Sequence, residues 1–244
     1  MSRRAAAAVA ARVLAQLRRD PRTLTLVVGV PCLLETLLKE LFSGQPHVFQ
    51  HVGAPLLGLF PFVTMFLVTS ITMLRERVSG TLERLMTLPL GKLDLLAGYG
   101  IAFALLAAVQ AAVVSVLAFG ALGLETNGPR VVVVALAVGN AVLGSALGLF
   151  FSAFAQTEFQ AVQFMPAVVF PQVLLCGLFV VRGSMATWLR WLSDALPLTY
   201  AYDALAHTAS GTFDGRFAVD VAVAVGAALL ALGLGAATLR RRTA

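Results

Sequence analysis

The sequence is short of charged residues, and this shortage narrows its class. Charged side chains make up 12% of the 244 residues, whereas 59% of the residues are hydrophobic. Soluble domains carry about 25% charged residues. A soluble domain of this length needs a polar shell around its core, and too few charges are present to form one. The composition therefore predicts a membrane protein.

Cysteine is also scarce. Cys32 and Cys176 are the two thiols of the chain, and each falls inside an apolar run. In such a run a cysteine acts as a small buried hydrophobe, so neither a disulfide framework nor a metal site is expected. The N-terminal residues mix alanine with arginine and lack the long apolar core of a signal peptide, so we expect no cleaved leader.

Long apolar runs divide the chain into six predicted membrane spans. A bilayer core about 30 Å thick needs roughly 20 mainly apolar residues per helix. The runs lack the alternation of barrel strands, so we expect helices, whose backbone groups are satisfied within the segment. The predicted fold class is an all-α membrane protein, a bundle of six transmembrane helices that forms one domain over 1–244. The spans lie near 23–43, 53–74, 97–123, 130–155, 161–181 and 218–239.

The basic residues predict the orientation of these spans. If both termini are cytoplasmic, thirteen of the 18 Lys and Arg residues lie on the cytoplasmic side and five on the other side. Cytoplasmic loops are the ones enriched in Lys and Arg. The net charge of +6 then faces the anionic lipids of the inner leaflet, and it requires no nucleic-acid partner. The Ala- and Arg-rich composition suggests a bacterial cell (inner) membrane.

The N-terminal segment 5–19 has an amphipathic pattern. Val9, Val13, Leu14 and Leu17 share one helical face, and arginines including Arg12 lie on or near the opposite face. This pattern predicts an interfacial helix on the cytoplasmic membrane surface. A disordered basic tail is the alternative.

The segment 182–217, on the other side of the membrane, is too long for a simple connection. Its Trp and Tyr side chains lie near the expected membrane interface, where aromatic residues are enriched. We therefore predict short helices that re-enter the outer leaflet. Asp203, His207 and Asp214 in this segment are interpreted as loop polarity rather than as a metal site.

The least apolar internal stretch is RERVSGTLERLMTLPLGKLDLL, residues 75–96, which contains the predicted cytoplasmic loop 75–92. Ser79-Gly80 interrupts the preceding helix, and apolar residues then recur at i, i+3 and i+4 until Pro89 ends the pattern. The stretch therefore predicts a short amphipathic helix beneath the membrane, with Glu83 and Arg84 on its polar side. An ordinary positive-inside loop is the alternative, although such a loop needs no compact helix between Gly and Pro.

Three motifs resemble the type 2 ABC exporter permease family. RERVSGTLERLMTLPLGKLDLLAGY resembles the intracellular loop of that family, with Gly91 where a helix-capping Ser is common. LGLFFSAFAQTEFQAVQFMPAVVFPQVLLCGLFV, residues 147–180, resembles a second region, although its turn at 155–161 lacks the usual Arg. The PLTY of WLRWLSDALPLTYAYDAL matches the family's outer re-entrant segment. Together they cover nearly the whole chain after residue 60.

The resemblance implies a permease half that works as a homodimer or heterodimer and is driven by a separate ATP-binding subunit. ATP and Mg would then be bound by that partner, and this chain would carry no cofactor, metal or catalytic residue. Residues 81–88 would be the coupling helix that inserts into a groove of the ATPase. The residues assigned to coupling are Glu76, Arg77, Ser79, Gly80, Thr81, Leu82, Glu83, Arg84, Leu85, Met86, Thr157 and Glu158.

The chain contains one near match to a phosphate-binding loop. GLETNGPR, residues 123–130, has two glycines at the required spacing, but Pro129 and Arg130 stand in place of the Lys and Ser/Thr. We interpret it as a turn. No carboxylate lies near the middle of a predicted span, which also favours an external source of energy.

Polar residues inside the predicted spans are candidates for the translocation path. Gln110, Asn140, Gln163 and Gln172 are neutral, and hydrogen bonds between helices explain them at least as well as contacts with a substrate. Glu35 is a further path candidate. With Lys39 at i+4 and Glu40 beside it, we favour a self-paired set at the outer interface over a substrate gate. Gly144 and Gly148 form a GxxxG, which favours close helix packing.

The predicted function is export of a hydrophobic or amphipathic small molecule, namely a drug, an antibiotic or a lipid. Export of a polysaccharide or lipid-linked glycan is the alternative. An intramembrane serine protease, with Ser145 as the nucleophile, is a remote alternative. Such an enzyme needs a histidine in a neighbouring helix, whereas His207 lies in the outer loop. A membrane subunit with a scaffold or uptake role also fits the span count.

Overall fold

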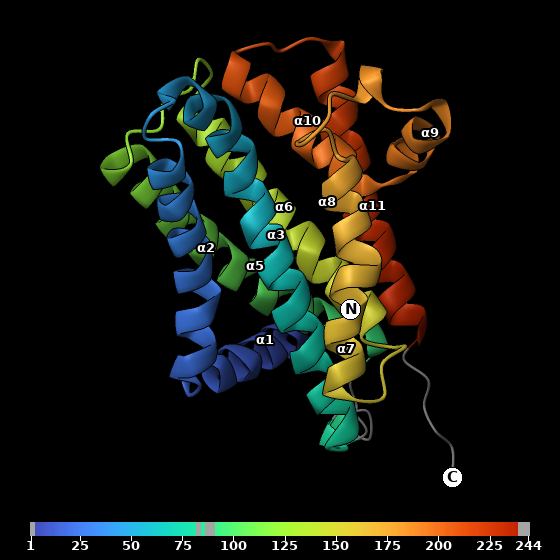
Figure 1. Ribbon diagram of the computed structural model, residues 1–244. Helices are drawn as coiled ribbons and strands as arrows, with labels where there is room; N and C mark the ends of the chain where they lie inside the picture. Colours follow the sequence, from blue (N-terminus) through green and yellow to red (C-terminus); the bar gives the residue numbers. More distant parts are fainter. Residues whose placement is uncertain (1–2, 82–83, 86–90, 239–244) are drawn as a thin grey trace.

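The computed structural model describes residues 3–81, 84–85 and 91–238 and forms a helical bundle (Figure 1). The helix α1 crosses one end of the bundle, and α9 and α10 lie at the opposite end (Figure 1). The elements are α1 (Arg3–Arg18), α2 (Pro21–Leu41), α3 (Pro46–Val78), α5 (Lys92–Val116), η1 (Leu117–Ala121), α6 (Arg130–Phe151), α7 (Glu158–Phe164), η2 (Met165–Val169), α8 (Phe170–Leu175), η3 (Arg182–Ser184), α9 (Thr187–Ala195), α10 (Pro197–Ser210) and α11 (Gly215–Thr238).

Four helical segments among the described residues are long and apolar enough to cross a membrane: Pro46–Val78, Ala97–Ala121, Arg130–Phe151 and Gly215–Thr238. They coincide with the predicted spans at 53–74, 97–123, 130–155 and 218–239. The two other predicted spans correspond to α2 and to the helical run α7-η2-α8. Neither of these is among the four candidate spans, so the count of six stays a prediction.

The predicted span at 161–181 is not one regular helix. A π-helical turn, η2, interrupts it where Pro166 has no backbone N–H to continue the α-helical pattern. Helical structure ends at Leu175, six residues earlier than predicted. Gly177 then has a φ of 108°, which an L side chain rarely adopts. The prediction of a helix through residue 181 is therefore wrong, because a glycine turn replaces its last part.

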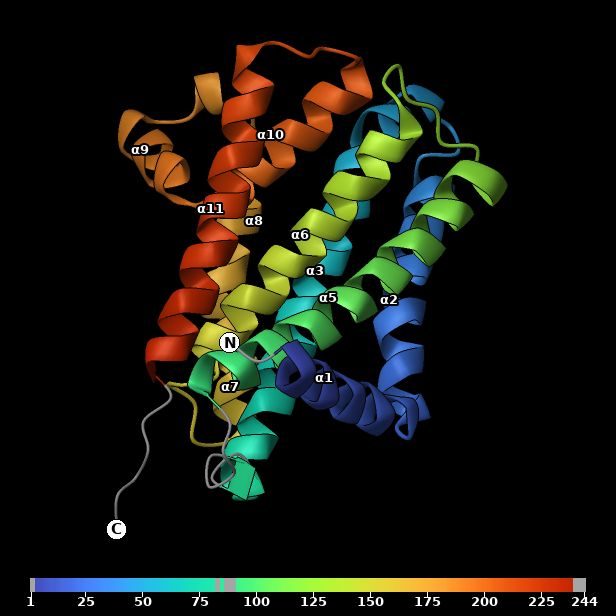
Figure 2. The same cartoon turned by 180° about the vertical axis from the view of Figure 1, so that it is seen from behind.

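A helix lies at Arg3–Arg18, where the sequence predicts one over 5–19. Its buried residues Val9, Val13 and Leu17 recur at i, i+4 and i+8 and pack in one cluster with Leu95 and Tyr99 of α5. Gly98 permits this close crossing, because a Cβ there would lie 2.5 Å from the Cβ of Val9. The helix α1 therefore uses its apolar stripe against α5 (Figure 2).

The helices α3 and α6 form the centre of the bundle. Gly144 and Gly148 of α6 lie against the backbone carbonyl oxygens of Phe62 and Phe66 in α3. A side chain at either glycine would overlap with these carbonyl groups. The close packing that the GxxxG predicts is therefore confirmed, and the glycines set the separation of the two helices.

We predict that Gly144→Ala lowers the free energy of unfolding by about 1–3 kcal/mol, because the added Cβ must push α3 and α6 apart. The measurement is thermal unfolding of the protein in detergent. Gly139→Ala, in the same helix, is the matched control, since no atom lies within 4 Å of a Cβ there. Equal losses in the two variants would contradict the packing role of Gly144.

Candidate functional site

The loop that the sequence predicts to be cytoplasmic begins with a glycine turn. The helix α3 ends at Val78, and Gly80 has a φ of 70°, a conformation that favours glycine. The hydroxyl groups of Ser79 and Thr81 lie 2.9 Å apart, and the Arg84 N–H donates to the Gly80 carbonyl over 3.0 Å. The predicted interruption at Ser79-Gly80 is therefore present, and a helical turn follows it.

The predicted coupling helix is described only in part. Leu82, Glu83 and Met86 lie outside the described residues. Leu85 is partly buried and packs against the cluster that α1 and α5 share. Arg84 is exposed. Of this predicted helix, Leu85 thus packs on the chain itself.

Arg12 ties three helices together at this end of the bundle. Its Nη2 lies 3.3 Å from each carboxylate oxygen of Glu76 in α3 and 2.6 Å from the hydroxyl oxygen of Tyr99 in α5. Glu76 is only 7% exposed, so the ion pair is largely shielded from water. The guanidinium also lies 5.8 Å from the Tyr99 ring centroid. The sequence assigned Glu76 to coupling but missed its partner.

A second ion pair connects the end of α3 to the first residue of α7. Arg75 Nε and Nη2 donate to the two carboxylate oxygens of Glu158 over 2.7 and 3.0 Å. This bidentate hydrogen bonding lowers the pKa of Glu158 below its ordinary value. The structure therefore brings the predicted coupling residues Glu76 and Glu158 to the same end of α3. Arg77 is half-buried, and its Nε has no hydrogen-bond partner among the described residues.

Capping residues position the two flanking helices. The Thr157 hydroxyl accepts a hydrogen bond from the Gln160 N–H over 3.2 Å, and the Gln160 side chain accepts from the Gln156 N–H over 2.8 Å. This arrangement is a capping-box variant that starts α7. At α2, Asp20 accepts from the Thr23 N–H and hydroxyl, which lowers the pKa of Asp20.

A cleft of about 260 Å³ lies between α1 and the end of α3. Residues of the α1–α2 elbow and of the loop line it together, including Gln16, Asp20, Arg75, Glu76, Ser79 and Thr81. The cleft is where the predicted coupling residues and the N-terminal helix meet.

A larger apolar groove of about 630 Å³ runs along α2 and α3 and is closed on one side by η2 and α8. Its walls are mostly aliphatic and aromatic, and Thr23, Thr64, Thr72 and Arg75 are the polar residues that line it. The groove reaches from the Arg75 end of α3 into the bundle, and an apolar molecule fits its chemistry. Its other lining residues include Leu26, Val30, Leu34, Leu67, Met165 and Phe170.

Comparison with known proteins identifies the family of this chain. Residues 4–209 match the family model described as ABC-2 type transporter. The chain belongs to the ABC-2 type transporter family. It is similar to ABC transporter G family member 20 of Dictyostelium discoideum, with 28% identity over 173 residues. The match covers 70% of this chain and 24% of that relative, so the chain spans about a quarter of the relative's length.

Membership in the ABC-2 type transporter family agrees with the membrane-spanning helices and with the predicted resemblance to type 2 ABC permeases. The chain is therefore an integral membrane protein and a transporter component. The family assignment does not identify the residues of the translocation path, so their placement is taken from the structure.

None of the three clefts described for this ABC-2 type transporter brings its candidate path residues together. Gln110, Asn140 and Gln172 are buried, and their side-chain nitrogens donate to the backbone carbonyls of Val27, Ala201 and Val168. Gln163 is exposed and lines a separate cleft of about 450 Å³ beside α7. The large groove is not lined by any of these four residues. Their role in translocation stays a prediction.

The predicted self-paired set around Glu35 is wrong. Glu35 is fully buried, and neither of its carboxylate oxygens has a hydrogen-bond partner among the described residues. Lys39 lies over the Phe49 ring, 5.0 Å from its centroid, and Glu40 is exposed. The physical reason is that α2 directs the face of Val27, Pro31 and Glu35 into the bundle.

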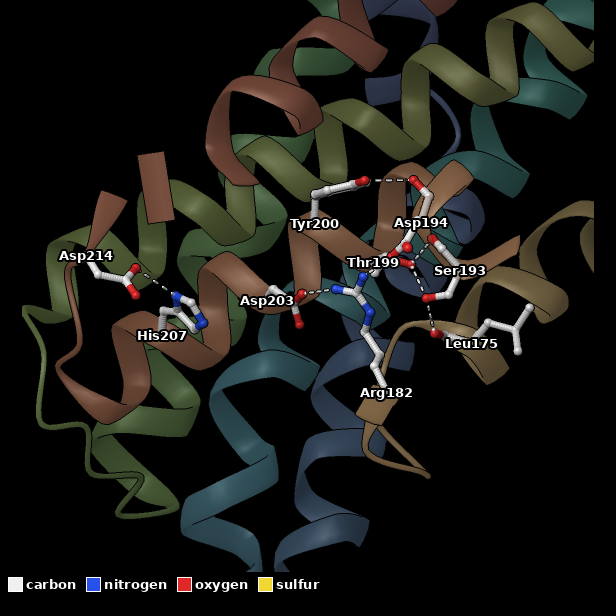
Figure 3. A network of polar contacts seen from close by, with 9 residues as sticks. All are labelled: Leu175, Arg182, Ser193, Asp194, Thr199, Tyr200, Asp203, His207 and Asp214. Carbon is white, nitrogen blue, oxygen red and sulfur yellow. Dashed lines mark hydrogen bonds and ion pairs between the residues drawn. The ribbon is translucent and has the colours of Figure 1, made fainter. Parts of the chain in front are cut away.

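At the opposite end of the transporter, Arg182 organises the segment 182–217 (Figure 3). Its guanidinium pairs with Asp194 of α9 and, over 2.6 Å, with Asp203 of α10. His207 lies 3.7 Å from Asp214, and the Tyr200 hydroxyl donates to the Asp194 carbonyl over 2.7 Å. The described residues hold no group of three or more His, Cys, Asp or Glu side chains that could bind a metal.

The interpretation of Asp203, His207 and Asp214 as loop polarity leaves out the specific pairs that these side chains form. His207 and Asp214 lie close to each other, and Asp203 pairs with Arg182, a cation that sequence reasoning did not single out. Arg182 is the first residue after the apolar stretch 161–181, and this position is the signal that could have identified it. A cation at such a boundary needs a carboxylate partner when it is half-buried.

We predict that Arg12→Met lowers the free energy of unfolding by about 1–3 kcal/mol, because Glu76 is left buried without its partner. Adding Glu76→Gln should recover part of that loss. Thermal unfolding of the single and double variants measures both effects. Arg18→Met, at an exposed position of the same helix, is the control, and a loss as large there would show that the Arg12 contacts contribute nothing specific.

Proposed function

We propose that the chain is the permease subunit of an ATP-driven ABC exporter that moves a hydrophobic or amphipathic small molecule out of the cell. The observation that carries the proposal is the joined cytoplasmic end, where Arg12, Glu76 and Tyr99 connect α1, α3 and α5 and Arg75 pairs with Glu158. A force applied to this end reaches several helices at once.

The energy source in this proposal is a dimer of separate ATP-binding subunits that bind ATP and Mg. Membership in the ABC-2 type transporter family supports such a partner. The coupling region would be the loop of residues 75–92 together with the turn at Thr157–Glu158. The exposed side chain of Arg84 and the capped start of α7 support a surface on which a partner can dock.

The membrane arrangement in this proposal has six spans and cytoplasmic termini, in a bacterial inner membrane. The helix α2 and the run α7-η2-α8 supply the fifth and sixth crossings, and the distribution of Lys and Arg supports the orientation. The helix α1 lies at the cytoplasmic surface, and α9 and α10 re-enter the outer leaflet. The permease works as a homodimer or heterodimer.

The substrate class in this proposal is a drug, an antibiotic or a lipid. The apolar groove along α2 and α3 supports cargo of this kind, because few polar groups line it. Export of a glycan is the alternative that the family leaves open. An intramembrane protease has no support, since the Ser145 hydroxyl donates to the Ala141 carbonyl and His207 lies beside Asp214.

Co-purification tests the proposal. A tagged chain isolated from its native membrane should bring down an ATP-binding protein, and candidate compounds should stimulate the ATPase activity of the complex. If the isolated chain alone transports cargo in liposomes without ATP, the proposal is wrong.

We predict that Glu83→Ala or Leu82→Ala uncouples ATP hydrolysis from transport, with transport reduced by about tenfold while ATPase activity persists. The physical reason is loss of the surface that the ATPase grips. The measurement compares ATP hydrolysis with transport in reconstituted vesicles. Leu85→Ala should show the same effect and should also lower thermal stability, because Leu85 packs against the chain's own core.

Arg190→Ala, on exposed α9, is the control for these coupling variants. Membrane insertion of every variant is checked by protease protection. Normal transport by the loop variants would contradict the coupling assignment.

We predict that α9 lies at the outer membrane interface. Trp188 and Trp191 are the two tryptophans of the protein, and they are 65% and 70% exposed on one face of α9. Tryptophan fluorescence therefore reports on α9 alone. Brominated or spin-labelled lipids should quench it most strongly when the quencher lies near the headgroups. Quenching by aqueous iodide alone would contradict the placement.

A further inference from the structure

The helix α2 contains a proline that leaves one of its carbonyl groups without a partner. Pro31 has no backbone N–H, so the carbonyl of Val27, four residues earlier, receives no helical hydrogen bond. Val27 is buried in the apolar core, and no bulk water reaches this carbonyl to compensate. A donor from outside α2 is therefore required.

Gln110 of α5 supplies that donor. Its Nε2 lies 2.7 Å from the Val27 carbonyl oxygen and 2.5 Å from the Thr64 hydroxyl oxygen of α3. The carbonyl can only accept, so the amide nitrogen of Gln110 must face it. Gln110 is fully buried, and one amide group thus holds α2, α3 and α5 together at the level of the proline.

Thr64 extends this hydrogen-bond network to the backbone of α3. Its hydroxyl group lies 3.0 Å from the Phe60 carbonyl and 3.2 Å from the Pro61 carbonyl, to either of which it can donate. It accepts from Gln110 at the same time. The chain of hydrogen bonds therefore runs from the side chain of α5 to the backbones of α2 and α3.

The contact also defines a wall of the apolar groove. Val27 and Thr64, which both accept from Gln110, line the groove of about 630 Å³ between α2 and α3, whereas Gln110 does not. Gln110 therefore lies behind the wall and sets the distance between its two sides. The side-chain oxygen of Gln110 has no hydrogen-bond partner among the described residues. The orientation of the amide group is therefore set by the two hydrogen bonds that its nitrogen donates.

We propose that Gln110 is a positioning residue that locks a hinge of α2 at Pro31 and thereby sets the width of the groove. While the amide bonds Val27 and Thr64, the two halves of α2 stay in one line against α3. When these bonds break, the outer half of α2, which carries Glu35, is free to tilt about Pro31. The inference rests on the packing of three helices and does not depend on ATP coupling.

A double-mutant cycle tests this lock. Gln110→Met keeps the side-chain volume but removes the donor, and the midpoint of thermal unfolding in lipid nanodiscs should fall by about 2–4 °C. Pro31→Ala gives residue 31 an N–H that donates to the Val27 carbonyl, so the loss caused by Gln110→Met should be clearly smaller in that background. Equal losses in the two backgrounds would overturn the proposal.

Hydrogen exchange tests the hinge itself. Amides of α2 beyond Pro31 should exchange about threefold to fivefold faster in Gln110→Met than in the unmodified protein, because one interhelical bond no longer opposes opening. Pro31→Ala should abolish that increase. Unchanged exchange in α2 would show that Gln110 has a structural role only, and the hinge would be rejected.

Gln172→Met is the matched control. Gln172 is another buried glutamine whose amide nitrogen donates to a backbone carbonyl, that of Val168 over 3.1 Å. Its loss should lower the unfolding midpoint without faster exchange in α2 and without dependence on Pro31. If Gln110→Met does not insert, Gln110→Asn, whose amide is one methylene too short to reach both acceptors, replaces it in the same cycle.

Discussion

In an apolar bundle every backbone carbonyl that loses its helical partner must find another one inside the protein, and much of this structure follows from that constraint. Pro31 frees the Val27 carbonyl, and Gln110 donates to it. Where the helix α8 ends, the Ser193 hydroxyl donates to the Leu175 carbonyl over 2.8 Å. Gln110 and Ser193 thus each complete the backbone of a neighbouring element.

The two ends of the bundle are held by different means. At the end that carries α1, Arg12 and Arg75 pair with carboxylates of other helices, so that charge connects elements far apart in the sequence. At the opposite end, Arg182 fixes α9 and α10 close to one another. The stretch between the ends is apolar and contains the groove. Ends held by ion pairs thus flank a groove that few polar residues line.

The periodicity and the length of the apolar runs predict most of the helices, because an apolar run of about 20 residues is typical of a membrane-spanning helix. The α1 stripe, the break at Ser79-Gly80 and the close packing at Gly144 and Gly148 all follow from local patterns. The sequence could not show which polar groups meet. Arg12 looked like a residue of the polar face because its partners lie 64 and 87 positions away. Glu35 and Lys39 looked like a pair by spacing, but packing turned Glu35 inward.

The long separation between Arg12 and its partners has a consequence for biosynthesis. At about 5–20 residues per second, the ribosome needs roughly 4–17 s to deliver Tyr99 after Arg12 has been made. Through that interval α1 has an apolar stripe and a cation but no α5 to receive them. The nascent segment must therefore wait on the lipid surface or on a chaperone, and the order of synthesis makes α1 one of the last pieces of this end to find its place.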